Sequence, residues 1–258
     1  MADGSQAHRR PLVAGNWKMN LTHLEGAVLA AEVAAALPSP VPVDVVLCPP
    51  FTALQAVGDV LAAAGGEVML GAQDLHWQER GAFTGEVSAG MLAALGCRYV
   101  IAGHSERRGL FGETDEMVAR KAAAARAAGL IPIVCVGETL EQRRAGRVEA
   151  VILGQLEAVL AAVSPDAGLV IAYEPVWAIG TGEAASPADA AAVARLIRDR
   201  LRQAGPGAGD VRILYGGSVT AENAAGFLSE PDLDGALVGG ASLDARSFAA
   251  IVEAAVKP

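Results

Sequence analysis

Long charge-free runs are missing from this sequence, although 52% of its 258 residues are hydrophobic. No stretch of 18 or more residues lacks a charge, and the most apolar segment, residues 27–37, is interrupted by Glu32. A membrane-spanning helix needs about 20 consecutive, mostly apolar residues. The pattern therefore argues against a membrane protein and predicts an amphipathic helix over this segment.

Cysteine is scarce as well. The three cysteines, Cys48, Cys97 and Cys135, are far apart and odd in number, which does not suit a disulfide framework. Each lies in or beside an apolar run. We expect buried thiols in a reducing compartment, and hence a cytoplasmic protein.

Positive charge is in deficit, since 20 Lys and Arg residues stand against 29 Asp and Glu residues, a net charge of −9 at pH 7. This balance argues against general affinity for nucleic acid or for an anionic membrane. If the ligand is an anion, a locally positive site must bind it against the overall field.

The first ten residues contain Asp3, His8, Arg9 and Arg10 but no apolar core. They do not resemble a signal peptide, and we expect residues 1–9 to form a disordered leader. The remaining residues, 10–258, are expected to form one catalytic domain, because a single α/β barrel commonly fills this length.

What the sequence does contain is an alternation of short β-branched runs with alanine-rich helical stretches. Most of the runs are apolar at consecutive positions, as in parallel strands that are covered on both faces. The predicted strands are 12–16, 43–48, 68–73, 99–103, 130–136, 169–173, 211–215 and 236–238. Eight βα units without a linker predict one closed (β/α)8 barrel. An open, doubly wound sheet is the alternative that periodicity leaves open.

Two of the predicted helices have clear signals. Ser186, followed by Pro187 and Asp189, predicts an N-cap with a capping acid. The last helix is predicted from apolar residues that recur at helical spacing, namely Phe248, Ile251, Val252, Ala255 and Val256.

Asn16 ends the first predicted strand and Lys18 comes two residues later; Lys18 is one of only three lysines. A lone lysine is usually a solvated surface charge. Here it alternates with Asn16 after a buried strand, so both side chains are expected to face the mouth of the barrel. An ammonium group in that place can hold a phosphate and stabilise negative charge that grows on a carbonyl oxygen.

His104 and Glu106 follow the fourth predicted strand. A single histidine is more often structural than catalytic, but at a strand end it is well placed to exchange protons with substrate oxygens. The four histidines have no paired spacing, which argues against a metal site. Glu106 and Arg107 have an alternative interpretation as a structural ion pair.

Glu174 ends the sixth apolar run and points into a partly desolvated space, which suits a base that takes a proton from carbon. The segment after it, residues 175–182, has a proline and glycines at its ends and Val-Trp-Ala-Ile in between. Such a segment is typical of a hinged lid whose apolar inner surface excludes water. An ordinary surface loop would leave this apolar run exposed.

Two glycine pairs, Gly216-Gly217 and Gly239-Gly240, follow the last two predicted strands. Glycine lets backbone N–H groups approach a ligand, and these loops are a common phosphate site in barrels. Either pair alone is weak evidence, because glycine pairs often serve only to turn the chain. Residues 180–185 match a dinucleotide fingerprint, but they do not directly follow a strand, so nucleotide binding is disfavoured.

At these residues the sequence resembles the triosephosphate isomerase family over nearly the whole chain, from about Pro11 to Lys257. Five motifs occur in the family's order and spacing. They are residues 15–18 (GNWK), 103–108 (GHSERR), 173–182 (YEPVWAIGTG), 215–219 (YGGSV) and 238–243 (VGGASL).

The resemblance implies a cofactor-free isomerase that interconverts dihydroxyacetone phosphate and D-glyceraldehyde 3-phosphate through an enediol(ate), in glycolysis and gluconeogenesis. It implies that Glu174 is the base and that His104 acts as a neutral imidazole on the two oxygens. Lys18 and Asn16 are implied to stabilise the enediolate, with Glu106 as an essential acid near Lys18. The implied phosphate-binding residues are Gly180, Ser218, Gly239 and Gly240.

A homodimer is implied too, in which the loop 73–86 enters the neighbouring subunit beside its first catalytic loop. The residues of that loop that match the family are Gln73, Asp74, Phe83, Thr84, Gly85 and Glu86.

Two other functions suit a barrel of this kind. Another phosphosugar enzyme, such as an epimerase or a Schiff-base lyase, is the first; a lyase needs an unprotonated lysine in an apolar site, whereas Lys18 lies beside Asn16 and Lys121 falls within a helix. The second is a non-catalytic barrel that has kept its phosphate affinity. A decayed enzyme should have lost at least one member of the catalytic set, and none is missing from Asn16, Lys18, His104, Glu106 and Glu174.

Overall fold

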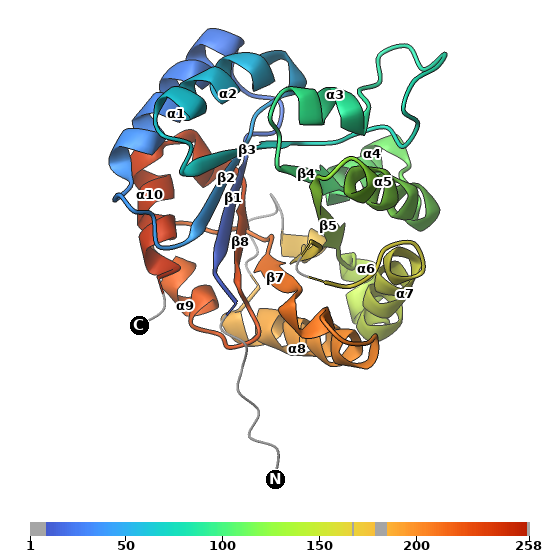
Figure 1. Cartoon of the computed structure of the whole chain (residues 1–258). Coiled ribbons are helices and arrows are strands. Elements are labelled where there is room, and N and C mark those ends of the chain that lie inside the picture. Colours follow the sequence, from blue (N-terminus) through green and yellow to red (C-terminus); the bar gives the residue numbers. More distant parts are fainter. Residues whose placement is uncertain (1–8, 167, 179–184, 257–258) are drawn as a thin grey trace.

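The computed structural model describes residues 9–166, 168–178 and 185–256, in which eight parallel strands close into a barrel in sequence order (Figure 1). The first and last strands pair with each other, so the sheet is closed and not doubly wound. The strands are β1 (Leu12–Asn16), β2 (Asp44–Cys48), β3 (Val68–Ala72), β4 (Tyr99–Ala102), β5 (Ile131–Val136), β6 (Val170–Tyr173), β7 (Arg212–Tyr215) and β8 (Gly235–Val238). All eight predicted strands are confirmed, each end to within one residue.

The continuous apolar character of the strands comes from two cores. Alternate residues face the interior of the barrel and pack there against one another. The residues between them face outward and form a larger core with the surrounding helices. Because both faces are buried, the sequence shows no polar alternation in these strands.

Ten helices of the described chain surround the strands (Figure 1). They are α1 (His23–Ala36), α2 (Leu54–Ala63), α3 (Ala89–Ala94), α4 (Ser105–Phe111), α5 (Asp115–Ala127), α6 (Leu140–Arg144), α7 (Val148–Leu160), α8 (Pro187–Gln203), α9 (Ala224–Leu228) and α10 (Ala245–Ala254). None of the helices in the described residues is long and apolar enough to cross a membrane.

The predicted helix signals are confirmed with one exception. Ser186 caps α8, and Asp189 reaches back to complete the capping box. Phe248, Ile251 and Val252 form the buried face of α10. The prediction was wrong for Val256, which follows the end of the helix and is 44% exposed. The helical spacing no longer applies there, because the chain has left the helix after Ala254.

The three cysteines are buried and free, as predicted. Cys48 and Cys135 lie in the interior of the barrel, and Cys97 packs in the outer core. Burial raises the pKa of the Cys97 thiol to about 12. The thiols are therefore protonated near neutral pH and act as small apolar side chains.

A buried ion pair ties α8 to the segment just before β8. Arg198 lies 2.5 Å from Asp234, and both side chains are almost completely buried. Asp234 also accepts the backbone N–H of Ile213 at 2.9 Å and pairs with Arg9 at 2.7 Å. Arg9 is the last residue of the expected leader, and residues 1–8 lie outside the described part of the chain.

We predict that Asp234→Ala lowers the free energy of unfolding by about 3–5 kcal/mol, because it leaves the Arg198 guanidinium buried without its carboxylate. Chemical denaturation followed by circular dichroism measures this. Asp199→Ala is the matched control, since Asp199 pairs with Arg202 on the exposed face of α8, and its effect should stay within about 0.5 kcal/mol. Equal losses for the two variants would contradict the prediction.

Candidate active site

The residues singled out from the sequence meet around a cavity of about 660 Å³ at the carboxyl ends of the strands. Parallel strands in a closed barrel bring these ends to a single rim. All five predicted catalytic residues line the cavity: Asn16, Lys18, His104, Glu106 and Glu174. So do three of the four predicted phosphate-binding residues, Ser218, Gly239 and Gly240. The fourth, Gly180, lies outside the described residues.

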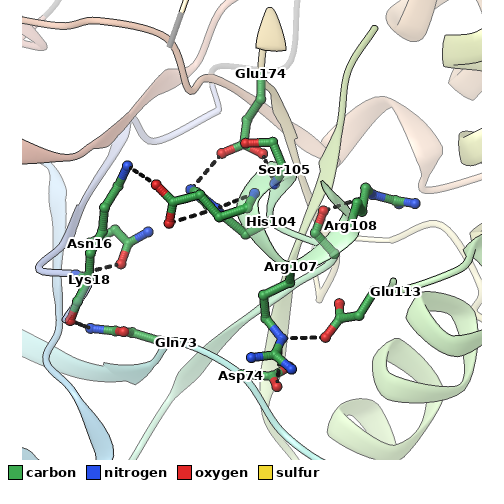
Figure 2. A network of polar contacts seen from close by, with 12 residues as sticks. Asn16, Lys18, Gln73, Asp74, His104, Ser105, Arg107, Arg108, Glu113 and Glu174 are labelled. Carbon is green, nitrogen blue, oxygen red and sulfur yellow. Dashed lines mark hydrogen bonds and ion pairs between the residues drawn. The ribbon is translucent and has the colours of Figure 1, made fainter. Parts of the chain in front are cut away.

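Lys18 is held at both ends (Figure 2). Its backbone has a left-handed φ of 52°, its N–H donates to Oδ1 of Asn16 at 3.1 Å, and its carbonyl accepts from Nε2 of Gln73 at 2.8 Å. Its ammonium lies 2.5 Å from Oε1 of Glu106. A non-glycine residue persists in this conformation only where neighbouring contacts enforce it, so the ammonium has a defined place at the cavity.

His104 caps the N-terminus of α4. Its Nδ1 accepts the backbone N–H of Glu106 at 3.2 Å. Because Nδ1 is an acceptor, the proton of the neutral ring is on Nε2, and Nε2 lies 2.9 Å from Oε1 of Glu174. The neutral ring thus presents an N–H to the cavity.

Two opposing influences act on the pKa of His104. Burial of the ring disfavours the imidazolium, but the facing Glu174 carboxylate, helped by Glu106, outweighs it and raises the pKa above its ordinary value. The influence of Glu174, which is larger than that of Glu106, exists only while its carboxylate is ionised beside the ring.

Glu174 is the most unusual group in the cavity, because it is a carboxylate with only 1% of its surface exposed. Its Oε2 accepts the backbone N–H of Ser105 at 2.8 Å. Its Oε1 has no backbone donor in the described chain and faces Nε2 of His104 at 2.9 Å. One oxygen therefore holds the side chain in place, and the other has lone pairs available for a proton.

The structure shows that the possible ion pair between Glu106 and Arg107 does not form. Glu106 pairs with Lys18, while Arg107 turns away to Asp74, at 2.9 Å, and to Glu113 (Figure 2).

Lys121 joins the same two carboxylates, lying 2.5 Å from Asp74 and in contact with Glu113. It is buried away from the residues that line the cavity, and a lysine paired in this way is unsuited to a Schiff base.

The segment after Glu174 matches the expected lid only in part. Val176 lines the cavity, as expected of an apolar inner surface. Trp177 instead donates from Nε1 to Glu138 at 2.9 Å, with the guanidinium of Arg143 4.8 Å from the centre of its ring. The carbonyl of Ala178 accepts the Ser218 hydroxyl at 3.1 Å. Ile179 and Gly180 lie outside the described residues.

Gly216, predicted as part of a glycine pair, lies against Glu174, where a β-carbon would come within 2.9 Å of the Cγ of Glu174. Two residues that support the site were not predicted, Ser105 and Glu138. Ser105 acts through its backbone N–H, for which no side-chain pattern exists. Glu138 follows the end of β5 and accepts from Tyr173 and Trp177. Its position after a strand was the available signal. The described residues contain no group of three His, Cys, Asp or Glu side chains that could hold a metal ion.

Comparison with known proteins agrees with this geometry. The profile of the triosephosphate isomerase family matches residues 11–255. The triosephosphate isomerase of Symbiobacterium thermophilum is 54% identical over 253 residues, which cover 96% of this chain and 98% of the relative. That of Alcanivorax borkumensis is 53% identical over 256 residues, with 96% and 99% covered. The crystal structure of triosephosphate isomerase from Bartonella henselae superposes with a TM-score of 0.87 at 41% identity, over 95% of this chain and 98% of that one.

We predict that Glu174→Gln lowers the pKa of His104. The substitution removes the carboxylate that raises this pKa and leaves the ring buried. At a pH between the two pKa values, His104 is mostly protonated in the unaltered protein and mostly neutral in the variant. NMR titration of the imidazole signals measures the difference. Glu157→Gln, at a partly exposed ion pair between α7 and α8, is the control and should leave the pKa of His104 unchanged, whereas an unchanged pKa in Glu174→Gln contradicts the assigned cause.

Proposed function

The chain belongs to the triosephosphate isomerase family and interconverts dihydroxyacetone phosphate and D-glyceraldehyde 3-phosphate, and from this premise we propose that Glu174 is the base that moves the proton. The observation that carries the proposal is the unequal environment of its two oxygens. Oε2 is held by the N–H of Ser105, whereas Oε1 has no backbone donor in the described chain and faces Nε2 of His104. A fixed carboxylate with an available lone pair is what abstraction of a proton from carbon needs.

In the proposed reaction, Oε1 of Glu174 takes a proton from the carbon next to the substrate carbonyl. The electron pair of the C–H bond forms a carbon–carbon double bond, and the carbonyl π electrons move to oxygen, which gives the enediolate. The N–H of His104 Nε2 donates to the oxygens in turn and relays a proton between them. Glu174 then returns its proton to the neighbouring carbon, so the enzyme ends unchanged.

We base the role of His104 on its hydrogen bonds. Its pKa is raised in the free protein by Glu174, but Nδ1 already accepts an N–H at the first turn of α4. A second ring proton would have to displace that bond. When Glu174 is protonated during the reaction, the larger of the two charges that favour the imidazolium is also gone. The neutral ring is therefore the form that donates to the enediolate.

Lys18 and Asn16 are proposed to stabilise the enediolate oxygen. Lys18 supplies positive charge at the cavity of a chain whose net charge is −9, and that charge is in place before the reaction begins, which is where electrostatic stabilisation is most effective. Glu106, at 2.5 Å, holds the ammonium in position.

The phosphate is proposed to lie between the loops after β7 and β8, where Ser218, Gly239 and Gly240 line the cavity. The carbonyl oxygen of Gly239 accepts hydrogen bonds from the hydroxyl and the N–H of Ser242, at 2.6 and 2.9 Å. A β-carbon at Gly239 would lie 3.6 Å from Cε of Lys18, which places the ammonium stem beside this loop. Gly180 stays a predicted phosphate contact from the sequence alone.

A homodimer is the proposed assembly. The loop 73–86, between β3 and α3, extends away from the barrel (Figure 1). Large apolar side chains are exposed nearby: Met19 by 95%, Leu110 by 77% and Phe111 by 66%. Met19, Phe51 and Phe111 line a second cavity of about 290 Å³, which adjoins the site at Lys18 and Glu106. The exposed apolar side chain of Phe83, on a second copy's loop, can pack against the apolar residues of this hollow.

Residues 10–258 are proposed to act as one catalytic domain, preceded by a leader, in the cytoplasm. The three free, buried thiols support a reducing compartment.

We predict that Glu174→Asp lowers kcat on the order of 100-fold, because the carboxylate is withdrawn by about 1 Å from the carbon. The KM should change much less, since the phosphate is held elsewhere. A coupled assay for glyceraldehyde 3-phosphate measures both. Glu157→Asp, on the outer surface, is the matched control. Full turnover by the Glu174→Asp variant would show that another group is the base.

We predict that replacing Phe83 and Thr84 together with aspartate gives monomers of greatly reduced activity, because charges at the tip of the loop cannot be buried in the apolar hollow of the partner. Sedimentation velocity and the same coupled assay measure the outcome. Leu24→Asp is the control, because Leu24 is exposed on α1; it should stay dimeric and active. If the doubly substituted protein is an intact, active dimer, the proposed role of this loop in dimerisation is wrong.

A further inference from the structure

The backbone of Glu174 rests on the residues that follow β5. Its N–H donates to the carbonyl of Val136 at 2.8 Å, and the N–H of Val176 donates to the carbonyl of Glu138 at 3.2 Å. Between these two bonds lies Gly137. A β-carbon at Gly137 would come within 1.8 Å of the carbonyl oxygen of Glu174. The two backbones are therefore in direct contact, and a shift of Gly137 displaces Glu174.

Gly137 is held from outside the barrel by one side chain of α7. Its N–H donates to Oε1 of Gln155 at 2.8 Å, and Nε2 of Gln155 donates back to its carbonyl at 3.2 Å. Strand β4 pairs with β5 only as far as Val134, so β4 offers no partner at this level. The amide of Gln155 bonds both backbone groups of one residue, as a neighbouring strand would.

We propose that Gln155 is a positioning residue for the base. It holds Gly137, Gly137 supports the backbone of Glu174, and the carboxylate is thereby placed for proton transfer. Gln155 is not among the residues that line the cavity, so it acts only through this chain of contacts. The proposal deepens the proposed function and rests on Glu174 being the base. An error of about 1 Å at a reacting group is enough to lower a rate on the order of 100-fold.

A purely structural role for Gln155, as a tie between α7 and β5, makes a different prediction. Loss of such a tie lowers the stability and the folded fraction, but each folded molecule keeps its full rate. A positioning role lowers kcat of folded molecules and leaves KM nearly unchanged, because Gln155 is not among the residues that line the cavity with the phosphate loops.

The first experiment compares Gln155→Leu with Gln55→Leu. Leucine removes both hydrogen bonds at similar size, and Gln55 is a matched control because its amide bonds only to Asp59 on the exposed surface of α2. With rates expressed per folded site, we expect kcat of Gln155→Leu to fall about 10- to 100-fold with KM within about twofold, and Gln55→Leu to match the unaltered protein. An unchanged kcat per folded site overturns the proposal.

The second experiment is a double-mutant cycle with Glu174→Asp. If Gln155 acts through Glu174, the two substitutions are not additive, and Gln155→Leu lowers kcat by no more than about threefold once the carboxylate is already displaced. If the effects of the two substitutions on kcat are fully additive, the proposal is overturned, even if Gln155→Leu alone lowers kcat. The Glu174→Asp single variant tests the proposed function separately, because full turnover by that variant would show that Glu174 is not the base.

If Gln155→Leu does not fold, Gln155→Glu takes its place in both experiments. A carboxylate keeps the acceptor for the N–H of Gly137 and loses the donor to its carbonyl. The expected result is a smaller fall in kcat, about 3- to 10-fold for one lost hydrogen bond, with the same lack of additivity toward Glu174→Asp. A kcat equal to that of the unaltered protein overturns the proposal here as well.

Discussion

Closure of the sheet by the pairing of β1 with β8 brings the carboxyl ends of the first and last strands together at one rim. Lys18 follows the first strand and Gly239 follows the last, and the stem of the lysine passes beside that glycine. An open sheet of the same strands would separate these residues by its full width. Closure also gives every strand a hydrogen-bonded neighbour on both sides, so no strand edge is left to pair with another chain.

The site places a buried carboxylate where most proteins avoid one. An ionised group out of water needs compensation, and Glu174 receives only part of it, from the N–H of Ser105 and from nearby His104. The incomplete compensation is what leaves an oxygen available for a proton. Elsewhere the fold pairs buried charges of opposite sign, as Arg198 with Asp234 and Lys121 with Asp74 and Glu113 illustrate.

Support for the site comes from the layer outside it. The backbone of Lys18 is held by Asn16 and Gln73, and Gly137, beneath the base, is held by Gln155 of α7. The backbones of the charged residues at the rim are thus held in place by neutral amide side chains. A side chain with both a donor and an acceptor suits this task, because it can bond both backbone groups of one residue, as Gln155 does at Gly137.

The sequence by itself determined the eight strands and the residues that follow them. A strand that is buried on both faces needs an unbroken apolar run, and polar residues directly after such a run have few places to go except the rim. For that reason Asn16, Lys18, His104 and Glu174 were recognisable before any coordinates. The capping box at Ser186 was equally local, because its hydrogen bonds join residues three apart.

Only the tertiary structure decided which neighbours these residues meet. Glu106 pairs with Lys18, 88 positions away, and not with adjacent Arg107. The N–H of Ser105 reaches Glu174 across 69 positions. Every residue except proline has the same backbone N–H, and a glutamine such as Gln155 is common on helix surfaces. No local sequence pattern therefore identifies either residue as part of the site. Their roles come from long-range register in the closed barrel, which places one peptide group against another.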